Sequence, residues 1–187
     1  ENPIGHWGFL AERSPVVMRP DQAVLPQLER VGVDPTSVRW VVQSHLHLDH
    51  TGALAVIDRL PNAEVLVTRT EYDVAHNPRS WERPAYCAAD YDKHGVQWSL
   101  LEDHEDGYDL YGDGTLICWR TPGHTAGHQS ILIGPPDGPK ALFLGDVVPT
   151  AVHVRLPWVM AYDLDPARNV ETKRSLFTRA LAEDWLL

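Results

Sequence analysis

The stretch SHLHLDHTG at residues 44–52 constrains this chain most, because it places three histidines and one aspartate within six consecutive positions. It directly follows the apolar run WVV at residues 40–42, which predicts a short buried strand. Side chains two positions apart in an extended segment point the same way, so His45 and His47 aim at one point in space. The fold must therefore bring two imidazole rings together at the end of a buried strand.

Asp49 and His50 follow where the chain leaves this strand, and they can turn toward a second point nearby. Neutral imidazole and carboxylate groups are good ligands for zinc and similar divalent metals. Two metal centres about 3.5–4 Å apart can together polarise a substrate and generate a hydroxide. A lone surface histidine usually has no role, but the frame H-x-H-x-D-H after a buried strand favours a dinuclear metal site.

Two later segments offer further ligands. RTPGHTAGHQS places His124 in a Pro-Gly turn between two predicted strands, and His128 follows four residues on. ALFLGDVV ends a strand with Asp146, whose carboxylate can bridge two metals with one oxygen on each. Gly-Asp at a strand end is common, so Asp146 becomes a strong candidate ligand only together with the histidine cluster. We expect His128 to support a metal ligand, or to be structural, rather than to bind metal itself.

The pattern of apolar residues predicts an α/β fold, namely an αββα sandwich with mixed sheets, outer helices and the metal site at one edge. Helices and strands alternate early, and a run of strands follows. Residues 77–95 lack a period and are expected to form an irregular functional loop, and residues 1–20 a loop packed over the fold. Helices are expected at residues 21–32, 52–60, 69–76 and 165–185, and strands at residues 39–44, 63–68, 96–101, 115–121, 129–134 and 140–146.

Two of these helices carry more detailed expectations. The first is expected to begin at Asp21 as its N-cap and to end before Gly32. Its apolar face would contain Val24, Leu28 and Val31. The apolar face expected for the last helix contains Val170, Phe177, Leu181 and Trp185.

Composition excludes several classes of protein. A chain of 187 residues is expected to form one domain over residues 1–187. The net charge of −10 and the lack of a basic stripe argue against nucleic-acid binding. No apolar run approaches the roughly 18 residues that a membrane span needs. Cys87 and Cys118 fit no zinc-finger spacing and are expected to be core or pocket thiols. The chain starts with Glu1, so a leader could precede it, but a cytoplasmic location is expected.

The order H-x-H-x-D-H, then T-P-G-H-T-x-G-H, then L-G-D resembles the metallo-β-lactamase-fold hydrolase superfamily. The resemblance covers most of the chain, from about residue 38 to the end, and its first motif is highly specific. It implies two divalent metal ions, zinc first, with manganese, iron or cobalt as alternatives. It also implies that His45, His47 and His124 hold the first metal, that Asp49 and His50 hold the second, and that Asp146 bridges them.

The same resemblance implies parts that this sequence does not contain. The second metal of the family usually takes one more histidine, some forty residues after the bridging aspartate, and N-terminal strands usually precede the first helix. We therefore expect a chain truncated at both ends, with the last ligand beyond Leu187. Alternatively, His153 or solvent completes the site. If the chain really ends here, weaker binding of the second metal and low activity are expected.

The implied chemistry is hydrolysis. A metal-bridging water would become a hydroxide near neutral pH and attack a small lactone, ester or related bond. Asp49 could steer that water and pass a proton to the leaving group, so Asp49 and Asp146 are the catalytic candidates. No nucleophilic serine or cysteine is required.

The sequence constrains the substrate less than it constrains the type of reaction. RTEYDVAH, TPGHTAGHQS and AYDLDPARNVETKRSL resemble N-acyl homoserine lactonases, but Pro149 stands where those enzymes commonly carry a tyrosine. Other features are closer to esterases and organophosphate hydrolases. Tyr162 could supply a phenol or simply be a core or loop residue. Trp7, Trp81 and Trp158 could line an apolar pocket or serve ordinary packing.

Four alternatives stay open beside the leading hydrolase. They are an organophosphate or aryl ester hydrolase, a β-lactamase-type amide hydrolase, a nuclease of the same fold and a non-catalytic scaffold. The acidic charge disfavours the nuclease, and the intact ligand pattern disfavours the scaffold. The expected partner is a small-molecule substrate, with neither nucleic acid nor membrane, and a homodimer is one option for assembly.

Overall fold

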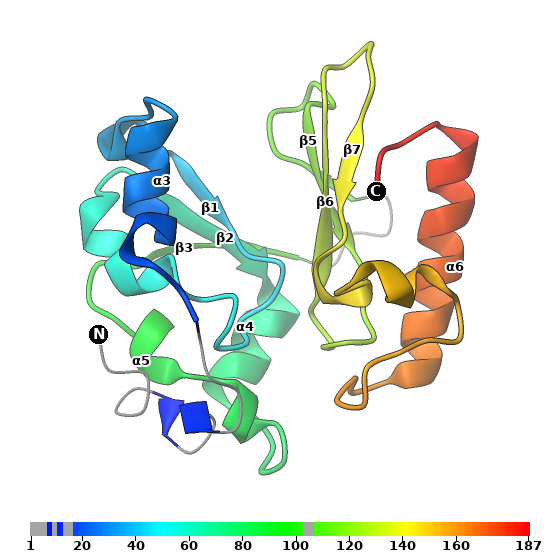
Figure 1. Ribbon diagram of the computed structural model, residues 1–187, viewed down its shortest axis with the longest axis horizontal. Coiled ribbons are helices and arrows are strands. Elements are labelled where there is room, and N and C mark those ends of the chain that lie inside the picture. The colour runs from blue at the N-terminus through cyan, green and yellow to red at the C-terminus, as the bar shows by residue number, and fades with distance from the viewer. Residues whose placement is uncertain (1–6, 9–10, 13–16, 103–106) are drawn as a thin grey trace. The chain divides into compact units, whose positions relative to one another are not determined.

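The computed structural model describes residues 7–8, 11–12, 17–102 and 107–187, so the loop expected over residues 1–20 lies largely outside the described residues. The chain forms two compact units (Figure 1). The first unit comprises Glu1–Leu66 and Ala75–Ser99, and the second comprises Val67–Val74 and Leu100–Leu187. The single-domain organisation expected from length stays a prediction.

The first unit is built around a strand that leads into the histidine stretch. β1 (Trp40–Val42) pairs in parallel with β2 (Glu64–Thr68), with Val41 opposite Val65. β3 (Gln97–Leu101) completes a sheet of order β1-β2-β3. The other elements are short and lie in the loops: η1 (Pro20–Gln22), α3 (Val24–Arg30), η2 (Pro35–Ser37), η3 (Leu54–Arg59), η4 (Arg83–Ala85) and α5 (Ala88–Tyr91).

The first predicted helix begins later than expected. Its α-helical part is α3, and Ala23 rather than Asp21 is the N-cap. Pro26 explains this start, because proline is tolerated in the first turn of a helix but not further inside it. The expected end is correct, since Val31 is the C-cap and Gly32 follows with φ of 71°. The predicted apolar face is wrong at Val31, which is 65% exposed.

The helix expected at residues 52–60 is a 3₁₀ helix. η3 spans Leu54–Arg59 and is kinked at Val56, whose φ of −120° is not helical. Two apolar side chains still face the interior, since Leu54 and Ile57 are buried three residues apart. That spacing matches one 3₁₀ turn. The apolar pattern therefore predicted burial correctly and the helix type wrongly.

The second unit contains an antiparallel sheet of order β4-β5-β6-β7. The three predicted strands are present, with one addition, the two-residue β4. The last of them ends at Phe143, so the expectation that Asp146 ends a strand is wrong, and Asp146 lies in a 3₁₀ turn. The unit also contains most of the predicted helix at residues 69–76. Its elements are α4 (Arg69–His76), β4 (Tyr108–Asp109), β5 (Leu116–Arg120), β6 (Gln129–Ile133), β7 (Ala141–Phe143), η5 (Gly145–Val147), η6 (Ala151–Val154) and α6 (Pro166–Ala182).

α6 packs along this sheet through a face that the sequence pattern predicted poorly. Asp165 is its N-cap, and its side chain accepts a hydrogen bond from the Arg168 N–H. Leu181 was expected on the buried face but is 85% exposed, and Trp185 lies beyond the end of the helix. The residues that α6 buries are Asn169, Thr172, Lys173, Leu176 and Ala180. Three of them are polar, so apolar spacing alone could not reveal this face.

The apolar core of the second unit joins α6 to β6 and β7, which lie beside it (Figure 1). Its buried members are Leu132, Leu142, Val147, Leu176, Ala180 and Trp185. Because η5 contributes Val147 to this core, the turn that carries Asp146 is anchored by packing. Among the described residues, no helix combines the length and the apolar character needed to cross a membrane.

Candidate metal site

The first unit brings together three of the predicted ligands. The ring of His45 lies with its centroid 4.6 Å from that of His47 and 4.1 Å from that of His50. His45 and His47 are buried, although they stand in a loop that follows β1. The predicted convergence of His45 and His47 is therefore confirmed, and His50 joins them.

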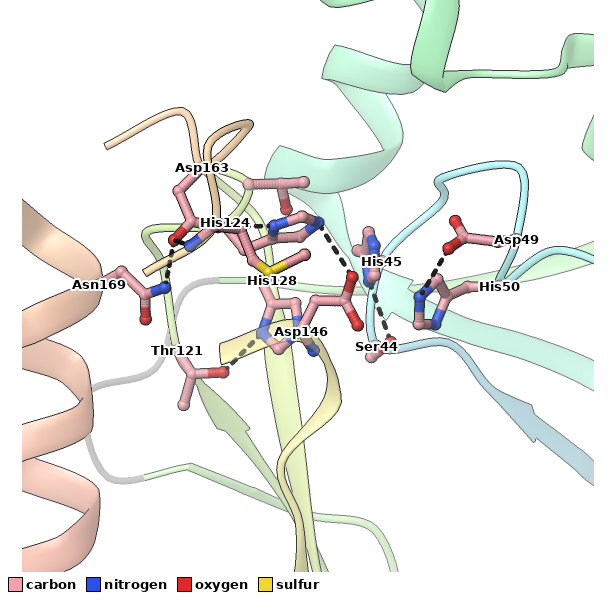
Figure 2. Close-up of polar contacts among 12 residues, drawn as sticks. Ser44, His45, Asp49, His50, Thr121, His124, His128, Asp146, Asp163 and Asn169 are labelled. Carbon is pink, nitrogen blue, oxygen red and sulfur yellow. Dashed lines mark hydrogen bonds and ion pairs between the residues drawn. The ribbon is translucent and has the colours of Figure 1, made fainter. Parts of the chain in front are cut away.

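Backbone and side-chain contacts hold these rings. The Nδ1 atom of His45 lies 3.1 Å from the Ser44 hydroxyl (Figure 2). His47 forms an isolated antiparallel bridge with Tyr86, and their rings meet edge to face at 4.9 Å. The N–H of Leu48 also donates to the Ala85 carbonyl. The irregular stretch at residues 77–95 therefore has a structural role, because it holds the chain at His47 and Leu48.

Asp49 differs from the three histidines in its exposure. Its carboxylate is 64% exposed and lies 3.7 Å from His50 Nε2. Immediately after this pair, the buried hydroxyl of Thr51 donates to the carboxylate of Asp90, which is also buried. The loop is thus anchored at Thr51, while the Asp49 carboxylate remains accessible to a small molecule.

The second unit orients His124 with a carboxylate. The Nδ1–H of His124 donates to Asp163 Oδ1 at 2.9 Å (Figure 2). Asp163 Oδ2 accepts two more hydrogen bonds, from the Asn169 amide at 2.6 Å and from the Met160 N–H at 3.1 Å. Burial alone would raise the pKa of Asp163, but the hydrogen bonds from His124, Asn169 and Met160 outweigh it and lower that pKa. Asp163 is therefore held as an anion.

This contact decides which nitrogen of His124 is available. With its proton on Nδ1, His124 presents the lone pair of Nε2, which lies 3.4 Å from Asp146 Oδ2. An imidazole nitrogen and a carboxylate oxygen thus stand side by side. Gly145 makes this possible, because its φ of 56° turns the chain sharply just before Asp146.

His128 makes hydrogen bonds through both ring nitrogens. Its Nε2 accepts a hydrogen bond from the Asp146 N–H at 3.1 Å, and its Nδ1 lies 2.8 Å from the Thr121 hydroxyl. Both ring nitrogens are therefore used within the protein. These contacts agree with support rather than metal binding at His128, and that role stays a prediction.

A buried carboxylate also holds the turn that carries His124. Glu71, in α4, accepts a hydrogen bond from the Thr125 hydroxyl at 2.6 Å. The Thr68 hydroxyl donates to the Gly127 carbonyl at 2.6 Å. A methyl group at Gly127 would overlap the backbone of Glu71, so this close approach requires glycine. The RTEYDVAH segment thus supports the site from a distance in sequence.

The aromatic candidates lie outside the core. Trp81 and Trp158 are 67% and 46% exposed, and the guanidinium groups of Arg79 and Arg155 lie over their rings. Tyr162 is 60% exposed, and its ring meets that of His124 edge to face at 5.9 Å. Of the core and loop readings of Tyr162, the loop reading is confirmed, since the residue is exposed in a turn. His153, the alternative last ligand, bonds the Thr150 hydroxyl through Nδ1 in η6.

Sequence reasoning missed several residues that orient the ligands. Asp163, Asn169, Tyr86 and Glu71 lie far along the chain from the histidines that they serve, and no local spacing connects them. Asp163 is 39 positions from His124. The signal in the sequence was that Asp163, Asn169 and Glu71 stand in segments that resembled lactonases.

The donors of each unit suit a divalent metal. Imidazole nitrogens and carboxylate oxygens are ligands that zinc, manganese, iron and cobalt accept. A metal-binding histidine almost always donates its other N–H to a carboxylate, carbonyl or water, and His124 has this arrangement with Asp163. The residues present therefore fit the metal that the sequence pattern implies.

These features define a family. Residues 7–186 match the model of the metallo-beta-lactamase superfamily, and the chain belongs to it. An N-acyl homoserine lactonase AttM from Azorhizobium caulinodans is 41% identical over 186 residues, which are 97% of this chain and 70% of that relative.

Solved structures agree on the fold. An N-acyl homoserine lactone hydrolase with the product N-hexanoyl-L-homoserine bound at its catalytic metal centre gives a TM-score of 0.72 at 24% identity, over 90% of this chain and 62% of that chain. AidC, a dizinc quorum-quenching lactonase, gives a TM-score of 0.62 at 16% identity, over 83% of this chain and 58% of that chain. The chain thus spans about two thirds of the length of such relatives.

These matches confirm the predicted superfamily and the αββα class of fold. They also confirm the predicted class of enzyme, a metallo-hydrolase with lactonase relatives. Divalent metal binding is supported by the family and by the histidine-rich donors. The metal's identity and the assignment of ligands belong to the proposal below.

Proposed function

We propose that the intact protein hydrolyses N-acyl homoserine lactones at a dinuclear metal centre. The observation that carries this proposal is the 41% identity with the Azorhizobium caulinodans lactonase over 97% of the chain. The chain also carries the family pattern, with H-x-H-x-D-H and the later segments that contain His124 and Asp146. The substrate is accordingly a small molecule. A homodimer, a cytoplasmic location and the absence of nucleic-acid binding stay predictions.

The proposed ligand assignment follows the family pattern. His45, His47 and His124 would hold one metal, Asp49 and His50 would hold the other, and Asp146 would bridge them. Its support is that each unit arranges its own donors suitably, with three close imidazoles in the first and the His124–Asp146 pair in the second. Zinc is the expected metal because imidazole predominates among the donors.

Bound divalent ions supply Lewis-acid polarisation of the lactone carbonyl and lower the pKa of a coordinated water. The chain supplies proton transfer and orientation. In ring opening, water adds to the carbonyl carbon, the ring C–O bond breaks, and the leaving oxygen takes up a proton. Asp49 suits the proton transfer, because its carboxylate is exposed beside His50. Asp163 keeps His124 in one tautomer throughout.

Pro149 favours a second candidate, hydrolysis of aryl esters or phosphotriesters. Lactonases commonly carry a tyrosine at this position, and proline offers no hydroxyl to a lactone. Tyr162 could replace that hydroxyl, because it is exposed and borders His124. The lactonase candidate therefore predicts that Tyr162→Phe impairs the hydrolysis of lactones, and the second candidate does not.

One experiment tests the proposal on the intact protein. Metal content is measured after purification, and hydrolysis is then assayed with N-acyl homoserine lactones, aryl esters, phosphotriesters and β-lactams. We expect two metal equivalents and the highest kcat/KM for a lactone. Asp146→Ala should lower both metal content and activity, whereas Asp137→Ala, in an exposed turn, should lower neither. Two bound metals without lactone hydrolysis would rule out the proposed substrate.

A further inference from the structure

His128 begins a chain of hydrogen bonds whose direction can be derived. Its Nε2 accepts from the Asp146 N–H, so the neutral ring carries its proton on Nδ1 and donates to the Thr121 hydroxyl at 2.8 Å. Thr121 then donates to the Ser130 hydroxyl at 2.9 Å, and Ser130 donates to the Leu144 carbonyl at 3.0 Å. In this series of hydrogen bonds, each of the three donors therefore has an acceptor.

This series of hydrogen bonds connects three strands close to the turn that carries Asp146. Thr121 directly follows β5, Ser130 lies in β6, and Leu144 directly follows β7. The side chains of Thr121, His128 and Ser130 are buried, with at most 1% exposed. In a buried setting an unmatched donor costs about 1–3 kcal/mol, so the alternative tautomer of His128 is disfavoured. With Nε2 protonated, its N–H would face the Asp146 N–H.

We propose that His128 is a positioning residue for the carboxylate of Asp146. Its ring holds the Asp146 backbone from one side, and the Leu144 carbonyl at the other end of the chain holds the strand that leads into the turn. Only Gly145 separates Leu144 from Asp146. The backbone is therefore fixed on both sides of the turn, and the carboxylate stays beside His124 Nε2. This inference rests on the proposed function in taking Asp146 as a metal ligand.

Two amide variants separate positioning from packing. In His128→Gln the side-chain oxygen can occupy the place of Nε2 and still accept from the Asp146 N–H. In His128→Asn the shorter amide can occupy the place of Nδ1 and still reach Thr121, but it cannot reach Asp146. Both variants lose the ring and its packing, so a merely structural role predicts similar effects from both.

The first measurement needs no metal. Amide hydrogen exchange of Asp146 is followed by NMR in the metal-free intact protein. We expect His128→Gln to keep the protection of this amide and His128→Asn to lose at least about tenfold. Unchanged protection in His128→Asn would overturn the proposal.

The second measurement is zinc affinity, determined by competition with a chromophoric chelator. Loss of a group that supports a metal ligand typically weakens binding about 10–100-fold, and we expect His128→Asn to show this at one of the two equivalents. His128→Gln should stay within about threefold of the parent protein. In lactone hydrolysis, kcat should fall for His128→Asn while KM changes little. Equal zinc affinity in the two variants would overturn the proposal.

Variants of Thr121 keep the test decisive if His128→Asn fails to fold. Thr121→Val removes the acceptor for His128 Nδ1 while keeping the side-chain shape, and Thr121→Ser keeps the hydroxyl. We expect weaker zinc binding in the valine variant and near-normal binding in the serine variant. Equal binding in both would count against the hydrogen-bond chain. If zinc affinity separates the variants but no lactone is cleaved, the proposed substrate fails and the positioning role stands.

Discussion

At the scale of single residues, Asp163 shows how a ligand depends on a side chain that binds no metal in the proposed site. It accepts hydrogen bonds from His124, Asn169 and the Met160 N–H, and these lower its pKa despite burial. Asp163→Asn removes the negative charge beside His124. We expect divalent metal affinity to fall about 10–100-fold, measured by chelator competition on the intact protein.

The control for this change is Asp137→Asn, which removes the same charge from an exposed turn. It should leave metal affinity within about threefold of the parent, a range well inside the expected 10–100-fold effect. If Asp163→Asn bound metal as tightly as this control, the orienting role of Asp163 would be contradicted.

Cys118 illustrates the effect of burial on a titrating group. Desolvation raises the pKa of its thiol to about 12, and 3% of the residue is exposed. Because the thiolate is the reactive form, we expect Cys118 to resist iodoacetamide at pH 8 in the folded protein and to react readily after unfolding. Peptide mass spectrometry gives the extent of labelling at each cysteine. Rapid labelling of Cys118 in the folded protein would show that its environment is misassigned.

At the scale of elements, the buried face of α6 depends on polar anchors. The ammonium of Lys173 donates to the Arg155 and Trp158 carbonyls, each at 2.8 Å, and Thr172 donates to the Pro122 carbonyl. Burial lowers the pKa of Lys173, while the charge of Asp163 opposes that shift. This helix therefore holds the loop that contains Trp158 through hydrogen bonds rather than through an apolar stripe.

Lys173→Met should destabilise the protein, because it leaves two carbonyl oxygens without their donor. We expect the free energy of unfolding to fall by about 1–3 kcal/mol in urea denaturation. Arg174→Met, on the exposed side of the same helix, should change it by less than about 0.5 kcal/mol. Similar losses in the two variants would mean that the two carbonyl contacts of Lys173 contribute little.

The elements also show where prediction from sequence succeeded. The strands β1, β2, β5, β6 and β7 and the helix α4 agree with their apolar patterns, because each pattern reflects burial along one short segment. Two errors have a local origin, since Pro26 delays the start of α3 and η3 is kinked at Val56. The third depends on another segment, because hydrogen bonds to distant carbonyls help to select the face of α6.

At the scale of the whole molecule, metal binding and folding should be coupled, because the proposed ligands lie far apart in the sequence, at residues 45–50, 124 and 146. Zinc added to the metal-free intact protein at 1,000 times its Kd should stabilise the folded state by about 4 kcal/mol, which raises Tm by about 8–16 °C. Calorimetry measures this shift. Asp146→Ala should show a clearly smaller rise, and an equal rise in that variant would contradict its role as a ligand.

The sequence by itself determined the class of protein. H-x-H-x-D-H after an apolar strand, His124 in its turn and Asp146 after Gly145 are local patterns, which can be recognised from the sequence without a structure. They predicted the superfamily and the fold class, both of which are confirmed, and the ligands, which stay a prediction. The role of His128 also stays a prediction.

Only the tertiary structure decided what holds those ligands. Asp163 meets His124 across 39 positions, Glu71 meets Thr125 across 54, and the Asp146 N–H meets His128 across 18. No spacing rule connects such residues, because they become neighbours only when strands and helices pack. A metal ligand is recognised by its own chemistry, whereas its orientation depends on hydrogen bonds from whatever the fold places beside it.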